Sequence, residues 1–185
     1  MAQGPRYHTQ FRRRTEGKTD FRRRLGLLKS RQARIVVRKK LNNVIVQVVD
    51  YSPQGDRVLA QAEARELATL GWTSSLKNTP AAYLTGLLAG KRAAAKGVKS
   101  GVLDIGRQMP SKGGKLFASL QGVIDAGIEV PAGDEMIPDK ERLQGEHIES
   151  LAADTFATVK SKIESGAANA TTKPPAKSGK KTGGA

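Results

Sequence analysis

Closely spaced arginines near the N-terminus are the residues best suited to a specific chemistry. They form two triplets, Arg12-Arg13-Arg14 and Arg22-Arg23-Arg24. A planar guanidinium can donate two parallel hydrogen bonds to one phosphate. Like charges at this spacing repel one another in a free chain, and a polyanion relieves that repulsion. The triplets therefore predict a phosphate-rich partner.

The charge of the chain is strongly segregated. Its 185 residues carry a net charge of +15. Residues 1–40 hold 14 Lys or Arg and two acids, whereas residues 41–165 hold 14 basic and 15 acidic residues. Residues 166–185 add four lysines and no acid. A near-neutral domain with basic appendages is typical of nucleic-acid binding, and the arm lacks the wide apolar face of a membrane-lying helix.

Other binding patterns fail. There is no cysteine, and His8 and His147 stand without neighbouring metal ligands. The segment 111–115 resembles a phosphate-binding loop, but Leu116 stands where that motif requires Ser or Thr. We interpret the segment as a basic loop in which Lys112 and Lys115 can contact RNA. No apolar run is long enough to cross a membrane, and neither a metal nor another cofactor is expected.

One catalytic alternative rests on two carboxylates. Asp50 ends an expected strand and Asp104 lies in another. Carboxylates on adjacent strands can hold two Mg²⁺ ions for phosphodiester hydrolysis. No third or fourth carboxylate stands at a suitable position, so we expect both to be ordinary strand-end acids and the protein not to be an enzyme.

The patterns favour RNA over DNA, and shape over base reading. No helix-turn-helix, zinc finger or basic zipper is visible, and no glycine pair has the G-x-x-G spacing of a KH loop. Aromatic residues make up only 4% of the chain, too few for a base-stacking platform. Tyr7, Phe11 and Phe21 remain candidates for stacking on exposed bases, although Phe21 could equally pack on the domain.

Hydrophobic periodicity predicts the elements that must position these residues. Asn42-Asn43 separates two β-branched runs and predicts a hairpin. Thr79 is the expected N-cap of a long helix with Pro80 at its first turn. Further expected elements are a helix from Asp20, strands at 35–37, 44–49, 57–60 and 101–106, and helices at 62–70, 80–97, 115–126, 139–148 and 153–163.

This order predicts one α/β domain with a mixed sheet packed by helices. The last strand follows a helical crossover and could be parallel to a neighbour. We expect a basic, extended N-terminal arm over 1–30, the α/β domain over 31–150, a C-terminal helix within 151–165, and a Lys-rich disordered tail over 166–185.

Several stretches resemble the large-subunit ribosomal protein L-eighteen family in its archaeal form. The resemblance covers about residues 4–150, and its specificity lies in the joint, ordered occurrence of the stretches. They are Gly4-Pro5-Arg6-Tyr7, Arg12–Arg14, Thr19-Asp20-Phe21, Arg24-Leu25, Leu27–Ser30, Arg34 with Arg38-Lys39, Tyr83–Gly90, Val102–Gly106, Ile124–Gly127, and Arg142 with Gly145, His147 and Ile148.

The resemblance implies a non-catalytic ribosomal protein of the cytoplasm. Such a protein binds 5S rRNA, attaches it to 23S rRNA in the central protuberance of the large subunit, and contacts the L-five family protein. It implies no membrane and no small-molecule substrate. Phe21 stands where the family leads us to expect Tyr, and the tail has no counterpart in it. The alternative is a basic RNA-binding protein outside the ribosome, or more remotely a Mg²⁺-dependent nuclease.

The expected RNA contacts combine the basic arm, the first-strand cations and the loop lysines. They are Arg6, Tyr7, Arg12, Arg13, Arg14, Lys18, Arg22, Arg23, Arg24, Lys29, Arg34, Arg38, Lys39, Lys40, Lys112 and Lys115.

Overall fold

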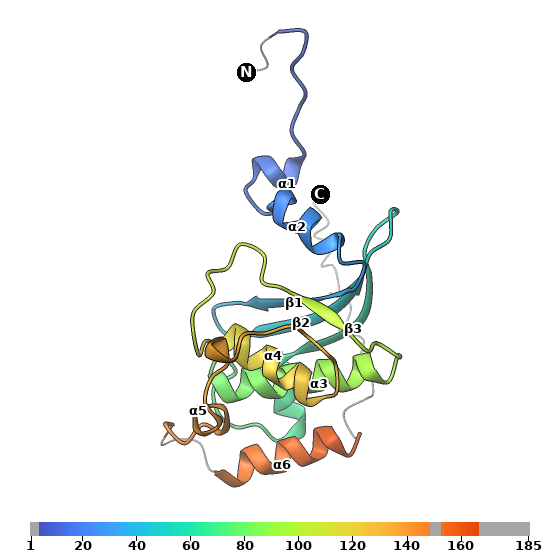
Figure 1. Cartoon of the computed structure of the whole chain (residues 1–185). Coiled ribbons are helices and arrows are strands. Elements are labelled where there is room, and N and C mark those ends of the chain that lie inside the picture. The colour runs from blue at the N-terminus through green and yellow to red at the C-terminus, as the bar shows by residue number, and fades with distance from the viewer. Residues whose placement is uncertain (1–3, 149–152, 167–185) are drawn as a thin grey trace, which may run out of the picture.

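A computed structural model describes residues 4–148 and 153–166 of the chain (Figure 1). The residues of the expected tail beyond Gly166 lie outside this description. In chain order the elements are α1 (Arg12–Thr15), α2 (Phe21–Leu28), β1 (Ala33–Lys39), β2 (Val44–Asp50), β3 (Arg57–Glu63), the 3₁₀ helix η1 (Ala64–Leu70), α3 (Thr79–Ala94), β4 (Gly101–Asp104), α4 (Lys115–Asp125), the 3₁₀ helix η2 (Asp134–Met136), α5 (Lys140–Gln144) and α6 (Ala153–Glu164).

The four strands form one mixed sheet in the order β3-β2-β1-β4. β1 pairs antiparallel with β2 and parallel with β4, and Val36 lies opposite Asp104. The expected α/β fold with a mixed sheet is therefore confirmed. The expected hairpin also forms, but Asn42 and Asn43 have negative φ, because a loop closed by the Lys40 N–H to Asn43 carbonyl bond of 2.7 Å replaces a tight turn.

The helices pack on one face of the sheet. Alternate residues of β1, such as Ile35 and Val37, are fully buried against them. Figure 1 shows α3 and α4 beneath the strands, with α6 on the far side of these helices. The other face carries polar side chains, and the amide of Gln47 donates to Gln61 across the strands. One covered and one polar face is the usual state of sheets built around antiparallel pairs.

α3 lies at the centre of the core, with contacts to the sheet, α4 and α6. Glycines let α3 and α4 approach closely, because a Cβ on Gly86 would lie 2.0 Å from the Ser119 carbonyl oxygen and one on Gly122 would lie 2.2 Å from that of Tyr83. The Gly86-x-x-x-Gly90 spacing of α3 therefore serves packing against a helix and not against the sheet, since the close neighbours of both glycines belong to α4 and the residue after it.

α6 belongs to the core of the domain. Phe156, Val159 and Ile163 are buried, and the Phe156 ring lies 5.9 Å from the ring of Tyr83. The Tyr83 hydroxyl donates to Asp125 at 2.7 Å. Burial, reinforced by this hydrogen bond, raises the pKa of Tyr83 well above its usual range. α6 therefore completes the helical layer beneath the sheet.

Three helix boundaries differ from expectation. The N-cap of α3 is Asn78, not Thr79, because the side-chain oxygen of Asn78 accepts from the Ala81 N–H at 2.9 Å. The helix expected from residue 62 begins later, since β3 runs to Glu63 and a 3₁₀ helix follows. α5 stops at Gln144 because Gly145 adopts a left-handed conformation. Among the described residues, no helix is long and apolar enough to cross a membrane.

Candidate nucleic-acid interface

The N-terminal arm projects from the end of the domain near β1, and Figure 1 shows it at the top in blue. Residues 4–11 form no helix or strand, and α1 and α2 follow. Asp20 begins α2 by accepting the backbone N–H groups of Arg22 at 3.0 Å and Arg23 at 3.1 Å. The hydrogen bond from Arg23 N–H is the main reason that the pKa of Asp20 lies below its usual value. The cap therefore stays charged and fixes the start of α2, the helix that carries the second arginine triplet.

The arm arginines differ in whether a carboxylate already neutralises them. Arg12 and Lys18 pair with Glu16, at 3.5 and 2.7 Å. Arg24 pairs with Asp56 at 2.9 Å. No ion pair with a carboxylate forms within the described residues at the remaining arm arginines, which are Arg6, Arg13, Arg14, Arg22 and Arg23. These five are exposed, so their charge is available to phosphates.

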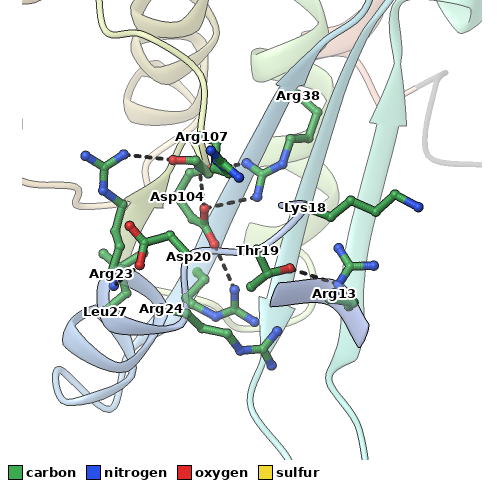
Figure 2. A pocket seen from close by; sticks show the side chains of 12 residues that line it. Arg13, Lys18, Thr19, Asp20, Arg23, Arg24, Leu27, Arg38, Asp104 and Arg107 are labelled. Carbon is green, nitrogen blue, oxygen red and sulfur yellow. Dashed lines mark hydrogen bonds and ion pairs between the residues drawn. The ribbon is translucent and has the colours of Figure 1, made fainter. Parts of the chain in front are cut away.

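Polar contacts, rather than apolar ones, hold the arm against the domain. Arg23 donates to the Gly106 carbonyl at 2.8 Å (Figure 2). Arg107 donates to the carbonyl of Gly17. Arg24 reaches both oxygens of Asp56 in the β2–β3 turn. Leu25 on α2 does not anchor the arm on the domain, because this residue remains 59% exposed.

A buried arginine–carboxylate network lies directly beneath the arm. Arg34 on β1 is bound to Asp104 at 2.8 Å and to Asp56 at 2.5 Å. Arg38, four residues further along β1 and on the same face of the sheet, donates to the Asp104 side chain at 3.0 Å and to its carbonyl at 2.6 Å. The two arginines and Asp104 come together because β1 and β4 are parallel neighbours. The network therefore links three segments that are distant in sequence.

Asp104 is the centre of this network. Burial by itself would raise the pKa of its carboxyl group, but the charge of Arg38 and the hydrogen bonds from Arg38, Gly106 N–H and Arg34 outweigh burial. The pKa of Asp104 therefore lies below its ordinary value. Asp104 is not the ordinary strand-end acid that we expected, because its residue is only 6% exposed and two guanidinium groups bind it.

The geometry gives no support to a two-metal nuclease. Asp50 and Asp104 lie on β2 and β4, which β1 separates. Two strand spacings amount to about 10 Å, whereas paired catalytic metals lie roughly 4 Å apart. No group of three or more His, Asp or Glu residues suited to a metal occurs in the part of the chain that the structure describes.

The remaining expected contacts fall into three groups. Lys29 follows α2 and is exposed, and Lys39 and Lys40 lie at the exposed end of β1. Gln108 bonds to the backbone of Lys39, which ties the loop after β4 to the β1–β2 hairpin. Lys112 in that loop pairs with Glu135 at 2.8 Å, whereas Lys115 is half-buried at the start of α4. Lys112 is thus already paired and Lys115 is partly covered, whereas the five arm arginines are exposed and unpaired among the described residues.

The three aromatic rings of the arm, those of Tyr7, Phe11 and Phe21, differ in how much of their surface is exposed to solvent. Phe11 is 74% exposed, and its ring lies 5.4 Å from the half-buried ring of Phe21. Phe21 thus has a stacking partner inside the arm. Tyr7 is 50% exposed. Both Tyr7 and Phe11 offer ring surface to a partner.

Arg34 differs from the other expected contact residues because its side chain is only 5% exposed. The residues that sequence reasoning missed are Asp56, Gly106 and Arg107, which hold the arm. Asp56 lies between β2 and β3, and nothing in its local sequence pattern points to the arm. Their role depends on contacts across 32 to 90 residues of sequence.

Comparison with known proteins agrees with the resemblance. Residues 5–101 match the family model described as "Ribosomal large subunit proteins 60S L5, and 50S L18". The "Large ribosomal subunit protein uL18" of Korarchaeum cryptofilum (strain OPF8) is 52% identical over 152 residues, which are 82% of this chain and 78% of that protein. The expected archaeal type is thereby confirmed. By both its family model and this relative, the chain belongs to the L-eighteen family of ribosomal large-subunit proteins.

Proposed function

We propose that this constituent of the large ribosomal subunit binds 5S rRNA with its N-terminal arm and attaches it to 23S rRNA in the central protuberance. The observation that carries the proposal is the set of five exposed arm arginines without a carboxylate partner among the described residues. Each guanidinium can pair with a phosphate and release counterions. Binding of this kind is strong and falls as salt rises.

The proposed contact surface follows the expected residues with one change of role. The arm cations, Tyr7, and Lys29, Arg38, Lys39 and Lys40 are assigned direct contacts, and Lys112 and Lys115 a peripheral contact. Arg34 is assigned a positioning role, because Asp56 and Asp104 already bind the two terminal nitrogens of its buried side chain. It holds the first strand to the segment that docks the arm.

Residues 1–30 form the RNA-binding arm in this proposal, and residues 31–150 with the following helix form the domain that fixes its direction. The domain has few exposed aromatic residues, so we assign it shape and backbone recognition of a folded RNA. A neighbouring L-five family protein is the proposed protein partner, and the cytoplasmic ribosome the proposed location. The role is structural and non-catalytic.

The test compares full-length protein binding to 5S rRNA and to a transfer RNA of similar charge density, in Mg²⁺ and at physiological salt. We expect 5S rRNA to bind at least roughly tenfold more tightly, a difference of about 1.4 kcal/mol. Equal affinities would contradict specific 5S recognition. The same reactions, incubated with Mg²⁺ and resolved by length, should contain intact RNA, and cleavage would contradict the non-catalytic role.

Attachment to 23S rRNA needs its own experiment. Large subunits reconstituted with 5S rRNA but without this chain should release 5S rRNA on sedimentation, and adding the chain should retain it. Retention of 5S rRNA without the chain would refute an attachment role while leaving simple 5S binding intact.

A further inference from the structure

A small cavity lies between the arm and the sheet. Its volume is about 130 Å³, and its walls come from α1, the α1–α2 turn, α2, β1 and the segment around Asp104 and Gly106 (Figure 2). That volume exceeds the space one water needs by roughly an order of magnitude. It is well below the roughly 300 Å³ at which pockets for drug-sized ligands begin. The cavity therefore suits a small group, not a nucleoside.

The cavity has a surplus of positive charge. Seven of its lining residues are Arg or Lys, and two, Asp20 and Asp104, are acids. Two flanking carboxylates also pair with lining residues: Glu16 with Lys18, and Asp56 with both Arg24 and Arg34. Four carboxylates against seven cations leave three positive charges in excess. Screening is weak in such a partly enclosed space, so an anion there relieves the repulsion.

The donors around the cavity are also incompletely used. Arg34 lines it with a side chain that is only 5% exposed, and its Nε–H has no acceptor among the described residues. A buried, charged donor without a partner is costly, and a bound anion or water can supply the missing acceptor. Arg23 and Arg107 each use one terminal nitrogen on a backbone carbonyl, and their other N–H groups have no acceptor within residues 4–148 and 153–166.

We propose that this cavity binds one phosphate group, and that the group is a backbone phosphodiester of the bound RNA. The source of the phosphate rests on the proposed function, whereas the phosphate site itself rests on the cavity alone. Several guanidinium groups converge there from separate elements, and a tetrahedral oxyanion can accept from more than one of them at once. Binding would join the arm to β1 and β4 through the ligand and fix the arm's direction on the domain.

The first test uses the full-length protein without RNA and inorganic phosphate as the probe. Arginine Nε–H resonances are followed by NMR while phosphate is added at constant ionic strength against chloride. The Arg34 resonance should shift in a saturable manner, and the exposed Arg65, outside the cavity, should not. A shift of the Arg34 resonance that rises linearly with phosphate concentration, or that chloride produces equally, would overturn the site.

Two matched variants test whether the cavity is responsible. Arg107→Gln removes an exposed cation from the cavity wall and should weaken phosphate binding roughly threefold or more. Arg65→Gln removes the same charge elsewhere and should leave it unchanged. Both changes lie at exposed positions, so both proteins should fold, and unchanged amide spectra outside the mutated segment check this. Equal weakening by the two variants would show a general charge effect and refute the site.

The second test identifies the source of the phosphate. In the complex with 5S rRNA, the Arg34 resonance should already be shifted and should no longer respond to added phosphate. An Arg34 signal that still titrates with inorganic phosphate in the complex would overturn the assignment to RNA. Failure of 5S rRNA to bind at all would refute the proposed function, and the RNA-free titration would still decide whether the cavity binds phosphate.

Discussion

Two full-length variants with equal loss of charge separate directed arginine contacts from charge alone. The first changes Arg6, Arg13, Arg14 and Arg22 to Gln, all exposed and without a carboxylate partner in the described part of the chain. The second changes the four lysines of residues 166–185 to Gln. Each variant loses four positive charges. If charge count alone governs RNA binding, the two variants should behave alike.

The expected difference follows from counterion release. Each phosphate contact contributes roughly 0.7 to 0.9 to the slope of log affinity against log salt. Four lost contacts should flatten the slope by about 2.8 to 3.6 in the arm variant, and much less in the tail variant. At about 1 kcal/mol for each contact after solvent screening, the arm variant should also bind roughly a thousandfold more weakly.

The assay is filter binding to 5S rRNA across a salt series from roughly 50 to 400 mM, with Mg²⁺ held constant. Circular dichroism checks that both variants keep the fold. Equal slopes for the two variants would refute the reasoning, because the arm would then act only as one of two loose clusters of charge.

Three further predictions test the network and the core. Asp104→Asn should cost about 3 kcal/mol in urea unfolding at pH 7, because it leaves the buried Arg34 with one partner. Folding lowers the pKa of Asp104 from its ordinary value of 3.8, so the stability that this carboxylate contributes is complete above pH 3.8 and is lost as the pH falls below it. The wild type should therefore lose more stability than the variant between pH 5 and 2. Parallel curves of unfolding free energy against pH for the two proteins would contradict the network. Arg24→Gln removes the bond to Asp56 and should speed amide exchange in α2 without changing exchange in α3, whereas unchanged exchange in α2 would mean that other contacts suffice. Gly86→Ala should destabilise the protein by about 3 kcal/mol, because the new Cβ meets the backbone of α4. Gly26→Ala, whose Cβ meets nothing within 4 Å, should stabilise the protein by up to about 1 kcal/mol. Similar melting temperatures for the two variants would contradict the close α3–α4 contact.

Much of the fold could be predicted because its signals are local. The β-branched runs around Val36 and Val46 became neighbouring strands, and Asn42-Asn43 separated them as expected. Helix starts were predictable to within one residue where short polar residues cap them, as at Asp20 and Asn78. The glycines of α3 were visible in the sequence, but their packing partner was not, because helix–helix pairing is a property of the whole chain.

The candidate site could be predicted only in its basic half. Runs of arginine are a compositional signal, and the arm was therefore visible. The carboxylates that pair with the basic residues were not visible. Asp56 and Asp104 reach Arg34 only after the strands of the sheet have paired. For the same reason the sequence could not show that folding buries the Arg34 side chain and pairs it with two carboxylates.

The central claim is that this chain carries 5S rRNA through its N-terminal arm. Its most direct test is ultraviolet crosslinking of the full-length protein in native cells, followed by sequencing of the attached RNA and mass spectrometry of the attached peptide. The account predicts that 5S rRNA dominates the recovered RNA, that 23S rRNA is second, and that crosslinks fall on arm residues such as Tyr7 and Phe11. Recovery mainly of messenger RNA or DNA, or crosslinks confined to the helical layer with none in residues 4–29, would contradict it.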